Sequence, residues 1–210
     1  MRWVSFITQP RRSLITLMRK RNLSVSDYAF LFDPPPANEW VSLDCETTGL
    51  NRKNDHIITI AAVKIVGNSI KSSERLKVTL CPPGLVKPES IRIHRLREVD
   101  VQYGVSAQEA TDKLLRFIGS RPLVGYNLKF DQDMINRLIM PIIGIKLPNQ
   151  MIDVAAMFHT YRARQTGQGD IDLGFAHILK TLEIPTWPAH DAYNDALMTA
   201  LIFLSLQHKL

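Results

Sequence analysis

Two acidic residues stand two positions apart in the stretch VSLDCETTGL, residues 41 to 50, which is otherwise typical of a buried β-strand. Side chains alternate along a strand, so Asp44 and Glu46 share one face while Leu43 and Cys45 point to the other. Two carboxylates on a dry face would repel each other and would lose their hydration, whereas a divalent cation removes both difficulties. Two solvated acids at an exposed strand end are the alternative, so the pair needs partners elsewhere in the chain.

A third acidic residue falls on the core face of a predicted helix. In KFDQDMINRL, Asp131 comes three, four and seven residues before Met134, Ile135 and Leu138. This spacing places all four side chains on one face of a helix, where apolar residues belong. Asp131 is therefore a candidate metal ligand.

The neighbouring polar residues have simpler interpretations. Asp133 lies on another helix face, four residues before Arg137, which predicts an exposed ion pair. Asn127 precedes the helix and is predicted to cap its first turn.

A fourth acidic residue stands out in HDAYNDALMTALIFL near the end of the sequence. Asp195 shares a helix face with three residues of core type, namely Met198, Thr199 and Ile202. His190 is five residues earlier, about 140° away on a continuous helix, so it can meet Asp195 only from the preceding loop. Pro188 favours a loop there because proline is poorly tolerated inside a helix. Asp191, four residues before Asp195, stays open as an alternative ligand.

Together these segments offer four carboxylates and one imidazole. Hard oxygen ligands suit Mg²⁺ or Mn²⁺ rather than zinc, and such ions bind through a few carboxylates plus substrate phosphate. Two ions about 3.5–4 Å apart can hold the attacking and the leaving oxygen of a phosphoryl displacement. An imidazole with an ordinary pKa near 6.5 can take the proton of the attacking water. The residues therefore indicate phosphodiester hydrolysis.

These residues must be positioned by a mixed sheet and its helices. The apolar pattern predicts three successive strands, at residues 40–46, 56–66 and 74–80, separated by turns at 47–55 and 67–73 and joined as an antiparallel meander. A helix at 106–119 with a Ser106/Glu109 capping box follows, and then a strand at 122–126, a helix at 128–140, a strand near 150–154 and helices around 173–182 and 192–206. Alternation in the second half implies parallel pairing, so the fold class is α/β with helices flanking the sheet.

The basic character of the chain is concentrated at its start. Residues 1 to 26 contain six Lys and Arg residues and no acid, which accounts for the whole net charge of +6. Their apolar spacing favours an amphipathic helix, with Leu14, Leu17, Met18 and Arg21 following its period. A helix docked on the main domain, an arm for nucleic-acid phosphates and a mitochondrial transit peptide are the three interpretations. The rigid DPPPANEW segment divides an extension and Pro-rich linker, residues 1–37, from a catalytic domain, residues 38–210.

Composition limits the setting. The two cysteines, Cys45 and Cys81, are too few for a disulfide framework and are interpreted as core residues of a protein from a reducing compartment. Apolar runs fall short of the ~20 residues that a membrane span needs, so no membrane partner is expected. We expect a soluble, cytoplasmic protein, or a mitochondrial one if the basic start is a transit peptide.

The acidic segments resemble the motifs of the DnaQ-like 3′-5′ exonucleases of the DEDDh type, the family that includes the proofreading subunit of bacterial DNA polymerase III. LDCETTGL, GYNLKFDQDMI and HDAYNDALMTA match the three motifs of this family in the right order. PESIRIHRL, which contains His94, is similar to a stretch that the family carries between the first two motifs, and Asp153 matches an acid common after the second.

The resemblance implies a ribonuclease H-like fold with a mixed five-stranded sheet. It implies that four acids bind two divalent ions and that His190 activates water, the acids being Asp44, Glu46, Asp131 and Asp195. It also implies that Thr47 and Leu50 contact the 3′-terminal nucleotide. Phe130 either lines the same groove or belongs to the core. Members of the family release 5′-mononucleotides from a 3′ end.

The sequence departs from the motifs of this family at two positions. Tyr126 stands where relatives often have His, and Cys45 where they often have Thr or Leu, but neither is expected to bind metal. The chain stops soon after its last helix, without a polymerase-binding tail, which favours a stand-alone nuclease while leaving polymerase association open. Single-stranded DNA is the expected substrate. Short RNA, as for an oligoribonuclease, and an inactive nucleic-acid-binding module are the alternatives.

Overall fold

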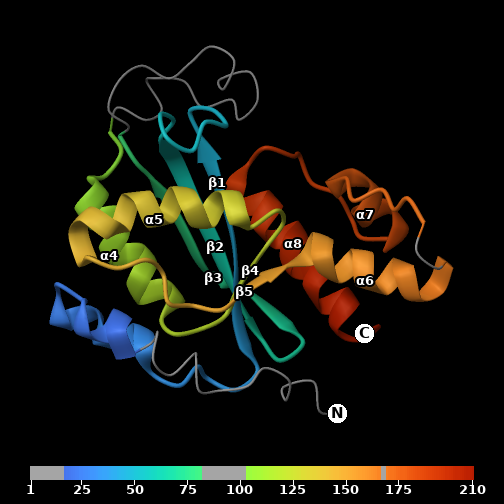
Figure 1. Ribbon diagram of the computed structural model, residues 1–210. Helices are drawn as coiled ribbons and strands as arrows, with labels where there is room; N and C mark the ends of the chain where they lie inside the picture. Colours follow the sequence, from blue (N-terminus) through green and yellow to red (C-terminus); the bar gives the residue numbers. More distant parts are fainter. Residues whose placement is uncertain (1–16, 82–102, 167–168) are drawn as a thin grey trace.

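Five strands form one mixed sheet with helices on both of its faces (Figure 1). The computed structural model describes residues 17–81, 103–166 and 169–210. The strands are β1 (Glu39–Thr47), β2 (Ile57–Val66), β3 (Ser69–Thr79), β4 (Leu123–Gly125) and β5 (Met151–Asp153), in the spatial order β3-β2-β1-β4-β5. Pairing is antiparallel between β1, β2 and β3 and parallel between β1, β4 and β5. The predicted α/β class, meander and mixed five-stranded sheet are confirmed.

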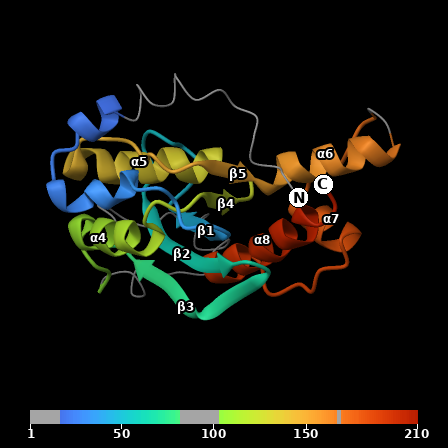
Figure 2. The ribbon, with the colours of Figure 1, turned by 90° about the horizontal axis from the view of Figure 1, so that it is seen from below.

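The helices enclose two separate apolar cores, one on each face of the sheet. They are η1 (Ser26–Phe32), α4 (Ala107–Ile118), α5 (Lys129–Ile143), α6 (Val154–Thr166), α7 (Phe175–Thr181) and α8 (Ala192–Gln207). Leu43 and Ile135 belong to the core under η1, α4 and α5, whereas Val63 and Phe203 belong to the core under α6, α7 and α8. Figure 2 shows these two groups of helices on opposite sides of the sheet.

Successive side chains of the central strand β1 point to opposite faces of the sheet, so alternate residues enter the two cores. Val41, Leu43 and Cys45 enter the first core. The residues between them face α8, because the Ser42 hydroxyl donates a 2.8 Å hydrogen bond to the carbonyl oxygen of Ala196. This is the face that carries the two β1 carboxylates.

Two predicted elements differ from the structure, and a third element was not predicted. The turn expected at 67–73 is shorter, because β3 starts at Ser69 after the two residues Gly67 and Asn68, and Gly67 has a φ of 57°. β3 is an edge strand whose outward residues are polar, so its first half lacks the apolar alternation that would have revealed it. α5 continues to Ile143 through Pro141, which is exposed and removes one backbone hydrogen bond near the helix end. α6 was not predicted at all, and it buries few residues, chiefly at its first turns.

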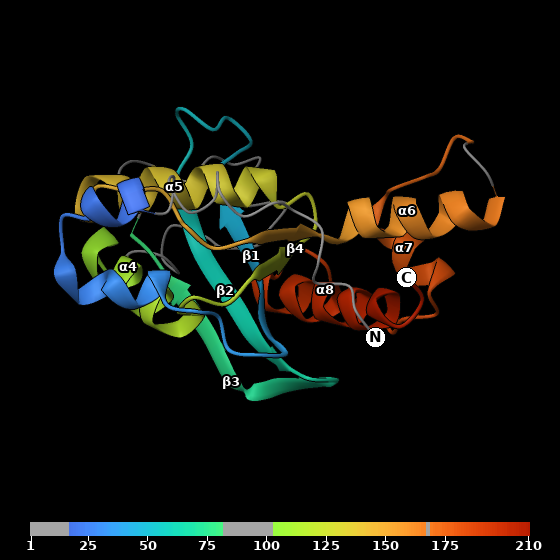
Figure 3. The same cartoon turned by 60° about the horizontal axis from the view of Figure 1, so that its bottom comes forward.

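The N-terminal part is described from residue 17 onward. Residues 17–21 are helical, but Leu17 and Met18 are 67% and 60% exposed, so this end of the segment buries no apolar stripe. Leu14, like His94, lies outside the described residues. Further on, η1 packs against α4 and buries Tyr28 and Leu31 (Figure 3). The division of the chain at residue 38 stays a prediction.

The cysteines and the membrane prediction can be compared with the structure directly. Cys45 is buried as predicted, but Cys81 is exposed, directly after the last residues of β3, so its assignment to the core is wrong. Within the described ranges, no helix is both long and apolar enough to cross a membrane.

Candidate active site

The carboxyl end of β1 carries the first two acids on the face that α8 covers. In the ladder with β2, Asp44 pairs with Ala61 and Glu46 with Thr59, and the register shifts between Glu46 and Thr47. Such a bulge bends a strand and re-aims the side chains next to it. Asp44 and Glu46 are half-buried there.

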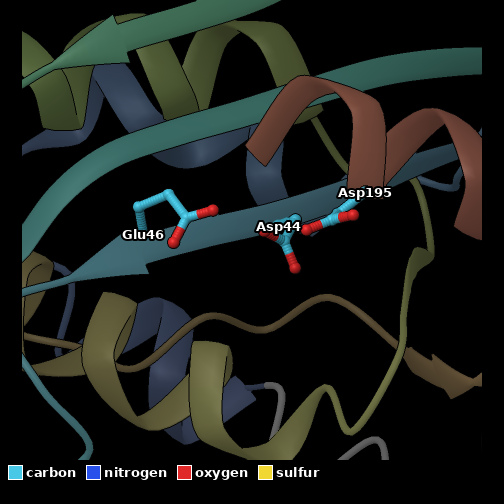
Figure 4. Close-up of side chains that lie close together, drawn as sticks. All are labelled: Asp44, Glu46 and Asp195. Atoms are coloured by element: carbon cyan, nitrogen blue, oxygen red, sulfur yellow. The ribbon is translucent and has the colours of Figure 1, made fainter. Parts of the chain in front are cut away.

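The first turn of α8 brings a third acid to this pair. One oxygen each from Asp44, Glu46 and Asp195 lie within 4.8 Å of one another. Figure 4 shows the Asp195 carboxylate beside that of Asp44, with Glu46 farther along β1. Oδ2 of Asp195 accepts a hydrogen bond, whereas its buried Oδ1 has no partner among the residues that the structure describes. An unpaired buried carboxylate oxygen facing two other acids is a position that a cation would fill.

Asp131 approaches from α5 on the other side of β1. It is 5% exposed, as its place on the apolar face predicted, and its Oδ1 accepts a 3.1 Å hydrogen bond from the backbone N–H of Cys45. This N–H is available because β4 pairs with β1 only through Leu123 and Val124, at Val41 and Ser42. Asp131 does not belong to the 4.8 Å group, but its charge contributes to raising the pKa of Asp44.

The start of α5 is held by an acid from β5. Asp153 accepts a 3.0 Å hydrogen bond from the N–H of Leu128 through Oδ2 and a 2.9 Å bond from the N–H of Ala155 through Oδ1. The predicted capping role of Asn127 is wrong, because the N-cap of α5 is Leu128, whose own side chain makes no capping bond, and Asn127 has a φ of 51°. A carboxylate far along the chain has taken the role that a local amide was expected to fill.

Asp133 ties the β1–β2 loop to α5. Its carboxylate pairs with Arg52 at 3.1 Å and with Lys129, whereas the predicted partner, Arg137, donates instead to the carbonyl oxygen of Arg52 at 2.8 Å. The guanidinium of Arg52 lies 5.8 Å from the ring centroid of Phe130, which is half-buried against the core. Loop and helix therefore form one connected surface.

The same loop carries the other residues expected to meet a nucleotide. Thr47 is 8% exposed and its hydroxyl donates to the carbonyl oxygen of Gly49 at 2.7 Å. Leu50 is 84% exposed although it is large and apolar. Asp55 is buried beneath the loop and accepts a 2.8 Å bond from the N–H of Asn51. Leu50 is thus exposed to solvent on a loop that the buried Asp55 holds in place.

His190 lies in the loop before α8, as its spacing from Asp195 predicted. Its backbone N–H donates a 3.0 Å hydrogen bond to Oδ2 of Asp195, and its side chain is exposed. Its backbone φ of 63° is in the left-handed region, which residues other than glycine rarely adopt. The backbone at His190 therefore depends on its neighbours to keep this conformation.

Asp191, the alternative ligand, is the N-cap of α8. Its Oδ1 accepts hydrogen bonds from the N–H groups of Tyr193 and Asn194, and its Oδ2 pairs with Nζ of Lys77 at 2.7 Å. These bonds occupy both oxygens, and Asp191 is not part of the 4.8 Å group.

The electrostatics of the acids favour a bound cation. Burial, reinforced by the charges of Asp131 and Asp195, raises the pKa of Asp44 well above its usual range. Burial also raises the pKa of Glu46 and of Asp131 to about 7 each, and raises the pKa of Asp195. Without a counter-ion, Glu46 and Asp131 are therefore partly protonated near neutral pH. Clustered oxygen donors are ligands for Mg²⁺ or Mn²⁺, so the residues fit the expected ions.

Some residues that shape the site were not found from the sequence. Lys77 reaches Asp191 from an edge strand, where an exposed lysine is ordinary. Asp153 was noticed only through the resemblance to the family. Its bond from the N–H of Leu128 joins β5 to the start of α5, and no sequence spacing signals this contact, whereas its bond from the N–H of Ala155 is local to the start of α6.

Comparison with protein families and curated sequences is consistent with this geometry. The family model RNase_T, described as Exonuclease, matches residues 41–203. A PolC-type DNA polymerase III from Caldanaerobacter subterraneus subsp. tengcongensis is 30% identical over 176 residues, which are 82% of this chain and 12% of that protein. The DNA polymerase III subunit epsilon of Aquifex aeolicus is 28% identical over 174 residues, which are 81% of each chain. The chain thus spans a small part of the PolC-type relatives it matches.

Solved structures share the fold. E. coli Exonuclease I in complex with a dA16 oligonucleotide superposes with a TM-score of 0.70 at 18% identity, covering 82% of this chain and 41% of that one. Exonuclease X in complex with 5′ overhanging duplex DNA gives a TM-score of 0.62 at 22% identity and covers 80% of this chain and 91% of that one. At these identities the likeness extends to the fold, which agrees with the expected ribonuclease H-like architecture.

Proposed function

Because the chain belongs to the RNase_T exonuclease family and has the DnaQ-like fold and motifs, we propose that it removes 5′-mononucleotides from the 3′ end of single-stranded DNA with two divalent ions, Mg²⁺ or Mn²⁺. The protein is a nuclease that hydrolyses phosphodiester bonds. What we propose beyond this is the 3′-to-5′ direction of hydrolysis, single-stranded DNA as the substrate and the use of two divalent ions.

One observation carries the proposal, namely the convergence of three acids within 4.8 Å, with Oδ1 of Asp195 buried and without a partner in the described part of the chain. We assign the ions to four carboxylates, those of Asp44, Glu46, Asp131 and Asp195. When bound, the ions supply Lewis-acid stabilisation of the attacking and leaving oxygens of the phosphoryl group. Asp131 keeps its place through the hydrogen bond that its Oδ1 accepts from the N–H of Cys45.

His190 is proposed as the general base. It accepts the proton of the attacking water while that oxygen bonds to phosphorus and the bond to the 3′ oxygen of the preceding nucleotide breaks. Its exposed position lets the imidazole return this proton to solvent. The hydrogen bond from its backbone to Asp195 keeps the base next to a proposed metal ligand.

The 3′-terminal nucleotide is assigned to the surface between the β1–β2 loop and α5. The exposed Leu50 offers an apolar contact to a base, and Thr47 lies where the strand ends beside the acids. Phe130, with the Arg52 guanidinium over its ring, extends this surface. Aromatic and cationic contacts of this kind bind single-stranded nucleic acid without reading its sequence. The relatives named as DNA polymerase III suggest a polymerase as a protein partner.

The test uses the purified chain with matched oligonucleotides. A 5′-labelled single strand is expected to give a ladder that shortens one nucleotide at a time in Mg²⁺ and stays intact in chelator, while a 3′-labelled strand releases its label as the first product. Glu46→Gln is expected to abolish both reactions. An RNA strand of the same sequence, degraded faster than DNA, would overturn the substrate assignment, and metal-independent cleavage would overturn the assigned chemistry.

A further inference from the structure

The edge strand β3 is tied to the first turn of α8 by an ion pair, by a cation–π contact and by a 3.5 Å hydrogen bond from the Tyr193 hydroxyl to the carbonyl oxygen of Ser72. Nζ of Lys77 is 2.7 Å from Oδ2 of Asp191, and the guanidinium of Arg75 lies 4.9 Å from the ring centroid of Tyr193. Both β3 residues project on the face that α8 covers, because Lys77 pairs with Ala61, which in turn pairs with Asp44 on the central strand. The proposed metal centre and this tie therefore share one row across the sheet.

Asp191 is the junction of this tie. Its Oδ2 takes the lysine, while its Oδ1 accepts the N–H groups of Tyr193 and Asn194 at 3.0 and 3.2 Å, and its carbonyl oxygen accepts the N–H of Asp195 at 3.0 Å. The residue immediately before it is His190, whose left-handed φ of 63° is held from the other side by Asp195. A backbone in this sparsely populated region persists only when its surroundings fix it.

We propose that Lys77 is a positioning residue that holds the proposed general base, His190, in its working orientation through the ion pair with Asp191. This inference rests on the proposed exonuclease reaction. The ion pair is about half exposed, with side-chain exposures of 46% and 41%, so it adds little to stability. A small displacement of a catalytic group nevertheless lowers the rate steeply, by about 10²-fold for 1 Å.

Three substitutions test the ion pair. Lys77→Met removes the charge and keeps the length of the side chain, Lys77→Arg keeps the charge, and Asp191→Asn keeps an N-cap but loses the charged partner. We expect Lys77→Met and Asp191→Asn each to lower kcat about 10- to 100-fold with KM little changed, and Lys77→Arg to restore most of kcat. The double variant should be no slower than the slower single variant, because both changes break the same link.

The design separates this role from two others. If Lys77 bound a substrate phosphate, Lys77→Met would raise KM, and the losses of the double variant would multiply. If the pair acted through charge on Glu46, the two substitutions would have opposite effects on the rate, because the lysine and the aspartate carry opposite charges. Either result, or an unchanged kcat, overturns the proposal. Lys64→Met is the matched control, since Lys64 of β2 pairs with Glu74 of β3 at 3.0 Å and lies over the Phe117 ring of α4, away from α8, and its loss should leave kcat unchanged.

Amide hydrogen exchange gives a readout that does not depend on activity. Lys77→Met should speed exchange of the N–H groups of His190, Tyr193 and Asn194, and Lys64→Met should not. Unchanged exchange at all three would overturn the proposal even if kcat fell. A parent protein without 3′ exonuclease activity would refute the proposed function and leave the exchange measurement to decide the role of Lys77.

Discussion

Replacing Asp131 by Asn is expected to make the metal-free protein more stable at pH 8 while abolishing its activity. Asp131 is 5% exposed, and burial raises its pKa from 3.8 to about 7. Below pH 3.8 both the folded and the unfolded state hold this proton. Between pH 3.8 and about 7 the unfolded state releases it and the folded state keeps it, so the free energy of unfolding falls as the pH rises. Asparagine has no proton to lose and avoids this penalty.

The magnitude follows from the shift. A pKa difference of about three units corresponds to about 4 kcal/mol, which is the largest gain that Asp131→Asn can give at pH 8. For a chain of this size such a gain raises Tm by roughly 10 °C. The asparagine oxygen can still accept the N–H of Cys45, so the fold is retained. At pH 4 the two proteins should differ little.

Thermal melting of both proteins in chelator at pH 4, 6 and 8 measures this effect. A second series with Mg²⁺ at pH 8 tests whether Asp131 is a metal ligand. The parent should gain stability from Mg²⁺ at pH 8, whereas Asp131→Asn should gain much less, because it lacks one proposed ligand. Asp133→Asn on the same helix is the control, since Asp133 forms partly exposed ion pairs, one with Arg52 at 3.1 Å, and its loss should change stability by less than about 1 kcal/mol. An Asp131→Asn protein that melts below the parent at pH 8 in chelator, or follows the same pH slope, would refute the reasoning.

Two further substitutions test the base and the support of α5. His190→Ala should lower the single-turnover rate about 10²–10⁴-fold while Mg²⁺ still raises Tm, and a retained rate with weakened Mg²⁺ binding would make His190 a ligand instead. Asp153→Ala removes the acceptor of the Leu128 and Ala155 N–H groups, so urea unfolding should show a loss of about 1–2 kcal/mol; an unchanged midpoint would mean that these bonds contribute nothing to stability.

The acids on the helices could be located from the sequence because a helix has a fixed period. Asp131 and Asp195 each fall on a stripe of apolar residues, and the structure places the apolar neighbours Met134 and Met198 in the core as that stripe predicts. A charged residue at such a position is costly unless something compensates it. Local pattern alone therefore identified two acids whose charges both act on Asp44 in the fold, although it could not give their separation.

The residues that support the site could not be found by the same reasoning, because each is of a type that is common at its position in a helix or strand. Asp191 is an ordinary N-cap, Lys77 an ordinary edge-strand lysine and Asp153 an ordinary acid at a strand end. Their roles come from partners far along the chain: Lys77 and Asp191 are separated by 114 positions, and no periodicity relates them. The N–H of Cys45 likewise can reach Asp131 because β4 pairs with β1 only at Val41 and Ser42, which is a property of the sheet. Sequence thus reveals ligands through their local misfit, whereas the groups that position them fit their surroundings and become visible only when the chain is folded.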